Sequence, residues 1–333
     1  MKQRRTIAII LVIITVLIII SVPVWLLTPL GANVLGLGQP DLNGPPLTPL
    51  MYKPLPRTTP QAELTPVGAP GQFSATEALL MDADTGTLLY EKKGETEVPM
   101  ASTTKIMTAL IAIQIGKLDQ VITVRQDAYD EVHDNGGSGA GLVPGDKITV
   151  RALLYGLMLP SGDDAAVALA DGLAGSTGNF VAIMNVEAQR LHLYQTHYAN
   201  VDGLEVTDNQ GHIIPGVHYT TPYDLARLAR YAMSIPLFAQ VVSTKEYDLS
   251  ATGTNHPYKW QNINNLLYDY SGTLGIKTGW TPQAGGCLVF AAKRNGHTLI
   301  GVALNSTNET TRFTDARALL NWGFSLPTQT PQV

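Results

Sequence analysis

The sequence has one cysteine and no excess of basic residues among its 333 residues, and both shortages limit what the chain can be. With Cys287 alone, no intrachain disulfide can form, so the fold depends on a hydrophobic core, which a chain of this length can build. Lysine and arginine number 22 against 27 aspartates and glutamates. Nucleic-acid binding needs a basic surface, and we expect no nucleic-acid partner.

Patterns that bind metals or phosphates are also missing. The spacing of His192 and His197 matches neither HExxH nor its inverse, and no cysteine, histidine and carboxylate set has zinc spacing. The glycine-rich stretch NGGSGAGL, residues 135–142, lacks the lysine of a phosphate-binding loop. The sequence therefore predicts no metal and no cofactor.

A long apolar run near the N-terminus is what the sequence does have. Residues 7–27, IAIILVIITVLIIISVPVWLL, carry no charge and are long enough to span a bilayer. The basic tail 1–6 favours a cytoplasmic N-terminus, which predicts a single-pass anchor in the cell membrane and an extracytoplasmic body. A cleaved signal peptide is the alternative, although the run is long for one and no A-x-A site follows it. No cysteine stands directly after the run either, so we do not expect a lipoprotein.

Residues 28–73 are rich in proline, and this composition favours an extended, partly polyproline chain. We interpret the segment as a tether that can hold a domain on the order of 100 Å from the membrane. A disordered leader without a spacing role explains the composition equally well. A folded domain is expected from residue 74 to 325, followed by a short tail, 326–333.

The pattern within residues 74–325 predicts an α+β fold. Apolar runs around Asp84-Thr85-Gly86 and around Asn295-Gly296 predict hairpins near the two ends of the domain, and 273–279 reads as a strand. Amphipathic patterns predict helices over residues 102–116, 149–160, 163–175, 179–193, 221–234 and 309–324. Hairpins outside a helical insertion indicate an antiparallel sheet flanked by helices, not a doubly wound parallel sheet.

Three short motifs follow one another along the domain. Ser102 and Lys105 are three residues apart at the start of a predicted helix, so their side chains can meet, and a serine hydroxyl is a poor nucleophile unless a base takes its proton. Alone, Ser102 is equally well explained as a helix cap. Ser161-Gly162-Asp163 lies between two predicted helices, where Ser161 or Asp163 can also be a mere cap.

The third motif, Lys277-Thr278-Gly279, lies on a predicted strand, where small residues leave the strand edge open to a ligand. A serine and lysine three apart, then a serine turn, then K-T-G is the active-site set of the penicillin-recognising serine enzymes. The flanks PMASTTKIMTAL, GDKITVRALLYGLMLPSGDDAAVALAD, HYTTPYDLARLARYAM and IKTGWTPQAGGCLVFAAKRNG extend the likeness over residues 75–323. In these stretches the chain resembles the D-alanyl-D-alanine carboxypeptidase family, the low-molecular-mass penicillin-binding proteins.

The resemblance implies that the chain removes the terminal D-alanine of peptidoglycan stem pentapeptides through an acyl-enzyme on Ser102, and that β-lactams acylate the same serine. Lys105 is then the base, which requires a neutral amine, and burial beside a second cation such as Lys277 favours that form. Ser161 relays a proton toward the leaving amine, and Asp163 holds Lys105.

The resemblance also implies how substrate is bound. Lys277 and Thr278 hold the substrate carboxylate, and Gly279 and Trp280 complete the binding strand. An oxyanion needs fixed donors, and the resemblance assigns them to the backbone N–H groups of Ser102 and Trp280.

Two positions depart from the family pattern. Asp163 stands where asparagine is usual, and an ionised carboxylate accepts hydrogen bonds but cannot donate them. Beside Lys105 it favours the ammonium and opposes its use as a base. Asp202, before Gly203-Leu204, replaces a histidine found in many relatives, and no loss of activity is inferred from it.

Three alternatives remain at this point. The first two are a β-lactamase and a DD-endopeptidase of the same fold. A class A β-lactamase uses a glutamate to activate the deacylating water, and no such glutamate motif lies between Ser161 and Lys277. The third is a non-catalytic protein that binds the cell wall or β-lactams, which Asp163 alone supports.

Overall fold

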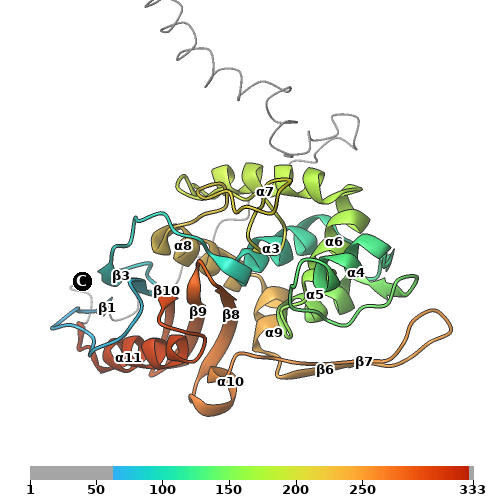
Figure 1. Cartoon of the computed structure of the whole chain (residues 1–333). Helices are drawn as coiled ribbons and strands as arrows, with labels where there is room; N and C mark the ends of the chain where they lie inside the picture. Colours follow the sequence, from blue (N-terminus) through green and yellow to red (C-terminus); the bar gives the residue numbers. More distant parts are fainter. Residues whose placement is uncertain (1–62, 330–333) are drawn as a thin grey trace, which may run out of the picture. The chain divides into compact units, whose positions relative to one another are not determined.

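A computed structural model describes residues 63–329 (Figure 1). The predicted membrane anchor, 7–27, and residues 28–62 of the predicted tether lie outside the described residues, whereas residues 63–73 are described. Within 63–329 no single helix is long and apolar enough to cross a bilayer, and only one sharply bent helix pair passes the same test. The described residues divide into two units, a short segment Thr207–Ile214 and the remainder.

The larger unit is built on a five-stranded antiparallel sheet in the order β3–β2–β10–β9–β8. Its strands are β2 (Glu77–Asp82), β3 (Leu88–Lys92), β8 (Thr273–Thr281), β9 (Gly285–Arg294) and β10 (His297–Ser306). Because β10 pairs with β2, the two ends of the domain meet in the middle of the sheet, and β8 is left at an edge. The predicted antiparallel sheet is confirmed.

Both predicted hairpins are present in this sheet. One joins β2 to β3, and the other joins β9 to β10 through Asn295 and Gly296. These two residues have φ values of 50° and 86°, the left-handed conformation that a tight hairpin turn requires and that asparagine and glycine tolerate best. A further short pair, β1 (Glu63–Leu64) with β11 (Thr328–Gln329), brings the two ends of the described chain together.

Alternate residues of the sheet enter two separate cores. On β2, Leu79 and Met81 pack into the larger core with the helical insertion, whereas Leu80 packs against α11 (Thr311–Ser325) on the other face. Figure 1 shows α11 on one side of the sheet and α8 (Pro222–Met233) on the opposite side. Because β2 lies between the two cores and is covered on both faces, every one of its residues is buried from solvent.

The helical insertion lies between the N-terminal hairpin and the three C-terminal strands of the sheet, and it carries two of the three predicted motifs. Its helices are α3 (Lys105–Ile115), α4 (Gln126–His133), α5 (Val150–Met158), α6 (Asp163–Ala174), α7 (Thr177–Arg190), α8 and α9 (Pro236–Ser243). Thr149, the first residue of the predicted helix 149–160, caps α5, because it accepts a hydrogen bond from the backbone N–H of Ala152 at 3.2 Å. The short α4, α9 and the hairpin of β6 (Glu246–Leu249) with β7 (Tyr258–Gln261) were not predicted.

The smaller unit, Thr207–Ile214, is a turn closed by an antiparallel bridge between Thr207 and Ile213. Inside it, the carboxylate of Asp208 accepts a hydrogen bond from the backbone N–H of His212 at 2.9 Å.

Candidate active site

Ser102 lies in η1 (Ala101–Thr104), a short 3-10 helix that leads directly into α3. It caps neither helix, because the capping positions belong to Met100 and Thr104 and neither makes a side-chain cap. Ser102 is only partly buried, whereas the other residues of η1 are buried. The serine is therefore the residue of this turn that a ligand can reach.

The backbone around Ser102 is held from two sides. Ala101 has a φ of 46°, in the left-handed region, and a Cβ on Gly203 would lie 2.0 Å from its carbonyl oxygen. On the other side, a Cβ on Gly279 of β8 would lie 3.0 Å from the backbone nitrogen of Ser102. Both glycines are thus needed for close approach of backbone to η1, which fixes the position of the serine.

Lys105 is fully buried and has three acceptors around its amine. Its Nζ donates to the Oγ of Ser102 at 2.9 Å, to the backbone oxygen of Asp202 at 2.9 Å, and to the carboxylate of Asp163. An ammonium has three N–H donors, and each has a partner here. In this arrangement Lys105 donates to Ser102, so it becomes a base for the serine only after losing a proton.

Asp163 starts α6 and joins Lys105 to the glycine-rich loop. One carboxylate oxygen accepts from Lys105, and the other accepts from the backbone N–H of Ser138 at 2.6 Å. An amide at this position would turn its NH₂ group toward one of these donors. The acceptor-only chemistry of aspartate therefore matches its neighbours, and the first turn of a helix also favours a carboxylate.

Ser161 precedes α6 in an uncommon backbone conformation. Its φ is 70°, and its backbone oxygen accepts from the Oγ of Ser138 at 2.6 Å. Left-handed non-glycine residues are rare and gather at functional sites, where the surrounding structure must hold them in place. The loop around Ser138 provides that support.

Lys277 reaches the same region from β8 and is also buried. Its Nζ donates to the backbone oxygen of Thr278 at 3.0 Å. Burial, followed by repulsion from Lys105 and Arg312, holds the pKa of Lys277 well below its usual value. The structure thus brings the two predicted lysines together, and Trp280 beside them is exposed.

Arg312 was not predicted, because nothing in the sequence distinguishes it from an exposed arginine of a polar helix. It projects from α11, is 5% exposed, and its Nη1 donates to the backbone oxygen of Gly279 at 2.7 Å. Within residues 63–329 its Nε has no hydrogen-bond partner. Its carboxylate neighbour, Glu309, is 4.0 Å away and largely exposed. A buried and poorly neutralised guanidinium behind β8 adds to the positive potential of the site.

Two carboxyl groups near Lys105 were also not assigned a role. Asp202 is buried, and burial together with repulsion from Asp163 raises its pKa to about 8. Glu131 of α4 accepts a hydrogen bond from the Nδ2 of Asn135 at 3.1 Å, and burial raises the pKa of Glu131 as well. Their sequence neighbourhoods, a polar helix and a loop, carry no signal that would place them there.

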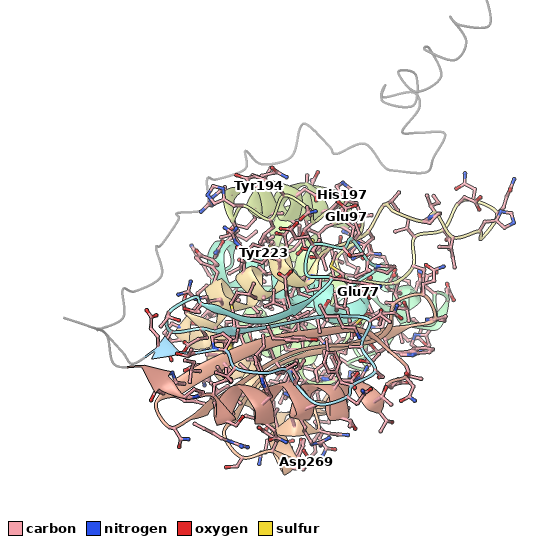
Figure 2. All side chains as sticks on the ribbon, turned by 90° about the vertical axis from the view of Figure 1, so that its left-hand side faces the viewer. Glu77, Glu97, Tyr194, His197, Tyr223 and Asp269 are labelled. Carbon is pink, nitrogen blue, oxygen red and sulfur yellow. The ribbon has the colours of Figure 1, made fainter. Side chains whose placement is uncertain are left out.

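His218 lies under η1, where its Nε2 is 2.7 Å from the Oγ1 of Thr104. Burial lowers the pKa of His218 to about 3, so this imidazole is neutral at physiological pH. The described residues contain no group of three or more side chains arranged to hold a metal ion. Figure 2 shows His197 at one end of the larger unit and Asp269 at the opposite end.

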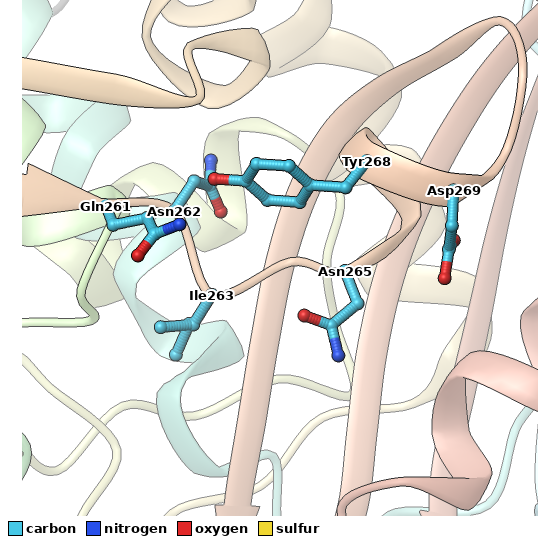
Figure 3. Close-up of a pocket in the computed structure, with 6 residues that line it drawn as sticks. All are labelled: Gln261, Asn262, Ile263, Asn265, Tyr268 and Asp269. Carbon is cyan, nitrogen blue, oxygen red and sulfur yellow. The ribbon is translucent and has the colours of Figure 1, made fainter.

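A pocket of about 390 Å³ lies apart from the predicted site residues (Figure 3). It is lined by Gln261, Asn262, Ile263, Asn265, Tyr268 and Asp269. None of these belongs to the three motifs. The lone cysteine is no rival nucleophile, since burial raises the pKa of Cys287 to about 11 and keeps it as a thiol.

Comparison with known proteins gives consistent results. The sequence model of the family described as "D-alanyl-D-alanine carboxypeptidase" matches residues 63–308. A D-alanyl-D-alanine carboxypeptidase from a Streptomyces strain is 42% identical over 76% of this chain and 88% of its own length. D-alanyl-D-alanine carboxypeptidase DacF of Bacillus subtilis is 33% identical over 75% of this chain. The match covers 62% of DacF, less than two thirds of its length.

Solved structures show the same relationship. The crystal structure of the DD-transpeptidase from the same Streptomyces strain matches with a TM-score of 0.71 and 42% identity, covering 78% of this chain and all of that one. Penicillin binding protein 6B of Escherichia coli matches with a TM-score of 0.69 and 34% identity, covering 80% of this chain and 82% of that one.

Proposed function

Because this chain belongs to the D-alanyl-D-alanine carboxypeptidase family and is a serine peptidase of that family, we propose that it removes the terminal D-alanine of peptidoglycan stem peptides through an acyl-enzyme on Ser102. The observation that carries the proposal is the 2.9 Å contact between the Oγ of Ser102 and the Nζ of Lys105. A nucleophile within hydrogen-bond reach of its own base, held by a third group, is the arrangement that covalent catalysis requires.

In the acylation step, the neutral amine of Lys105 takes the proton of the Ser102 hydroxyl while Oγ forms a bond to the carbonyl carbon. The oxyanion is held by the backbone N–H groups of Ser102 and Trp280. Ser102 is near the start of η1, where N–H groups have no partner inside the helix. When the C–N bond breaks, the proton that Lys105 took from Ser102 passes through the hydroxyl of Ser161 to the leaving D-alanine amine, which restores neutral Lys105. Water later hydrolyses the ester and regenerates the Ser102 hydroxyl.

The substrate carboxylate is recognised by Lys277 and Thr278, with the guanidinium of Arg312 behind the strand. The low pKa of Lys277 follows from burial and from the neighbouring cations. A carboxylate placed beside Lys277 favours its ammonium form. Substrate binding is therefore expected to take up a proton at this lysine, which links recognition of the terminal carboxylate to the charge of the site.

The same acylation makes β-lactams covalent inhibitors. The test is release of D-alanine from a synthetic peptide that ends in D-Ala-D-Ala, measured for the wild type and for Ser102→Ala. Ser243→Ala, an exposed serine of α9, is the matched control. We expect full activity in the control and none in Ser102→Ala. D-alanine release by Ser102→Ala at the wild-type rate would refute the proposal.

Transfer of the acyl group to an amine, or cleavage of existing cross-links, is a second candidate. It is favoured by the name DD-transpeptidase for the Streptomyces structure and D-alanyl-D-alanine endopeptidase for a Pseudomonas aeruginosa relative that is 29% identical. Incubating the enzyme with a pentapeptide, an added acceptor amine, and a cross-linked dimer separates the three outcomes. A carboxypeptidase releases free tetrapeptide and leaves the dimer intact. Sustained β-lactam turnover would instead indicate a β-lactamase.

We also propose that residues 7–27 anchor the protein in the cell membrane with the catalytic domain outside the cytoplasm. The uncharged apolar run and the basic residues before it support this topology. Membrane fractionation of the full chain, followed by protease treatment of spheroplasts, is the test. An anchored protein stays with the membrane and its domain is digested, whereas a cleaved leader would release a shorter soluble protein.

A further inference from the structure

We infer that His218 and Thr104 aim the backbone N–H of Ser102, one of the two proposed oxyanion donors, by fixing the carbonyl group of Ala101. Both are positioning residues, because neither contacts the reacting atoms. This role rests on the proposed acyl-enzyme on Ser102, and it adds how the protein orients one donor before the substrate arrives.

The direction of the hydrogen bonds follows from the two ring nitrogens of His218. Nδ1 accepts a hydrogen bond from the backbone N–H of Ala199 at 3.1 Å, so it carries no proton. Because the pKa of His218 is low, the ring is neutral at physiological pH and its one proton is on Nε2. Nε2 lies 2.7 Å from the Oγ1 of Thr104 and donates to it. This hydroxyl donates in turn to the backbone oxygen of Ala101 at 2.8 Å.

The carbonyl group of Ala101 and the N–H of Ser102 belong to the same peptide unit. The unit is planar, and in its trans form the C=O and the N–H point in opposite directions. A hydrogen bond that holds the oxygen of Ala101 therefore also sets the direction of the Ser102 N–H. The same bond polarises the peptide unit, which makes the N–H a stronger donor. At the start of η1 this N–H has no partner within the helix, so it is available to an oxyanion.

The hydrogen bond between Thr104 and Ala101 is closed to water. Both residues are buried. A Cβ on Gly203 would lie 2.8 Å from the Oγ1 of Thr104 and 2.0 Å from the oxygen of Ala101, so the backbone of Gly203 covers the bond. A water molecule has no room to replace the hydroxyl if it is removed.

The neighbouring Thr103 provides a matched comparison. Its Oγ1 donates to the backbone oxygen of Met100 at 2.6 Å, so it is also buried and also bonds to a carbonyl three residues back. That carbonyl belongs to the peptide unit between Met100 and Ala101, which does not contain the N–H of Ser102. Removal of either hydroxyl weakens the same turn, but only the hydroxyl of Thr104 acts on the proposed donor.

The first test is stopped-flow acylation by a labelled penicillin, which separates the dissociation constant of the initial complex from the rate constant of acylation. We expect Thr104→Val to slow acylation about tenfold and to leave the dissociation constant unchanged, because the donor acts on the oxyanion and not on the bound ligand. Thr104→Ser keeps the hydroxyl and should acylate within about threefold of the wild type. Thr103→Val is the control and should also stay within about threefold. Thermal melting verifies that each variant is folded.

The second test is the infrared spectrum of the acyl-enzyme formed with a penicillin that carries ¹³C in its β-lactam carbonyl. After acylation this carbon is the ester carbonyl on Ser102, and its oxygen lies at the oxyanion donors. Hydrogen bonds to a carbonyl lower its stretching frequency, so Thr104→Val should shift the band to higher wavenumber. A change that only destabilises the turn leaves the band in place, and Thr103→Val should do so.

The order of the hydrogen bonds predicts how two substitutions combine. His218→Leu removes the donor to Thr104 and should slow acylation about threefold in the wild type. In the Thr104→Val background it should cause no further loss, because His218 acts only through the Thr104 hydroxyl.

A Thr104→Val variant that keeps either the wild-type acylation rate or the wild-type carbonyl frequency would overturn the inference. An equal loss of rate in Thr103→Val or in Thr104→Ser would also overturn it, and so would a further loss when His218→Leu is added to Thr104→Val. Should Thr104→Val not fold, the carbonyl frequency of His218→Leu decides, and an unchanged frequency overturns the inference. Absence of Ser102-dependent acylation in the wild type would instead refute the proposed function.

Discussion

Replacing Gly279 by alanine tests whether the fit between β8 and η1 sets the rate of acylation. The added Cβ would lie 3.0 Å from the backbone nitrogen of Ser102, 3.1 Å from the Cβ of Ala101 and 3.2 Å from the backbone nitrogen of Thr103. All three are shorter than ordinary van der Waals contacts, so strand and helix must separate by a few tenths of an ångström. The turn cannot retreat freely, because Gly203 packs against the carbonyl of Ala101 on its other side.

Two effects of different size follow from this geometry. Overpacking by one methyl group costs about 1–3 kcal/mol of stability. The displaced atoms include the nucleophile and one proposed oxyanion donor, and loss of one such donor costs roughly 100-fold or more in rate. Since the shift is only a few tenths of an ångström, we expect acylation to slow about 10- to 100-fold while the protein still folds.

The assay is the rate of acylation by a labelled penicillin, with thermal melting measured in parallel. Gly253→Ala is the control, because nothing lies within 4 Å of the added Cβ there. A Gly279→Ala variant that acylates as fast as the wild type would show that the spacing of β8 and η1 does not position Ser102.

Three further predictions concern charge. Asp163→Asn should cost about 1–3 kcal/mol of stability, because the amide turns its own N–H toward one of the two donors, Lys105 or the backbone N–H of Ser138. Chemical denaturation measures this, and an unchanged free energy of unfolding would contradict it. In the folded protein the carboxyl group of Asp202 has a pKa of about 8, whereas in the unfolded chain it has its usual pKa of 3.8. Between these two pH values only the folded protein keeps the proton. The free energy of unfolding that Asp202 contributes is therefore largest below pH about 4 and is lost as the pH rises toward 8. Over that window the wild type should lose stability relative to Asp202→Asn. A difference in denaturation midpoint that stays constant with pH would contradict this. Binding a penicillin to Ser102→Ala should take up a proton at Lys277, visible as a dependence of calorimetric heat on buffer ionisation, and Lys277→Met should abolish that dependence.

Local signals predicted much of the fold. The Asn295-Gly296 turn is specified by two residues next to one another in the chain, and this prediction was confirmed. The α4 helix was missed because its eight residues are mostly polar and only Ala128 is buried, which leaves no clear apolar stripe. The β6–β7 hairpin was missed for a related reason, since alternate residues of β6 are only half-buried.

In the candidate site, too, contacts between residues close in the sequence were predicted, and contacts between distant residues were not. Ser102 and Lys105 were predicted to meet because residues three apart share a helix face. The position of Lys277 beside them was expected only from the resemblance. In the structure, Gly279 lets strand β8, which carries Lys277, lie close to the backbone of Ser102. His218 and Thr104 approach one another from a loop and a helix far apart in the sequence. Such a contact depends on tertiary packing, which no short-range pattern encodes.

The most direct test of the central claim is mass spectrometry of the protein after brief exposure to a penicillin. We expect one adduct per chain, located by peptide mapping on Ser102, and no adduct in Ser102→Ala. An adduct on any other residue, or an equal adduct in Ser102→Ala, would contradict the assignment of Ser102 as the nucleophile.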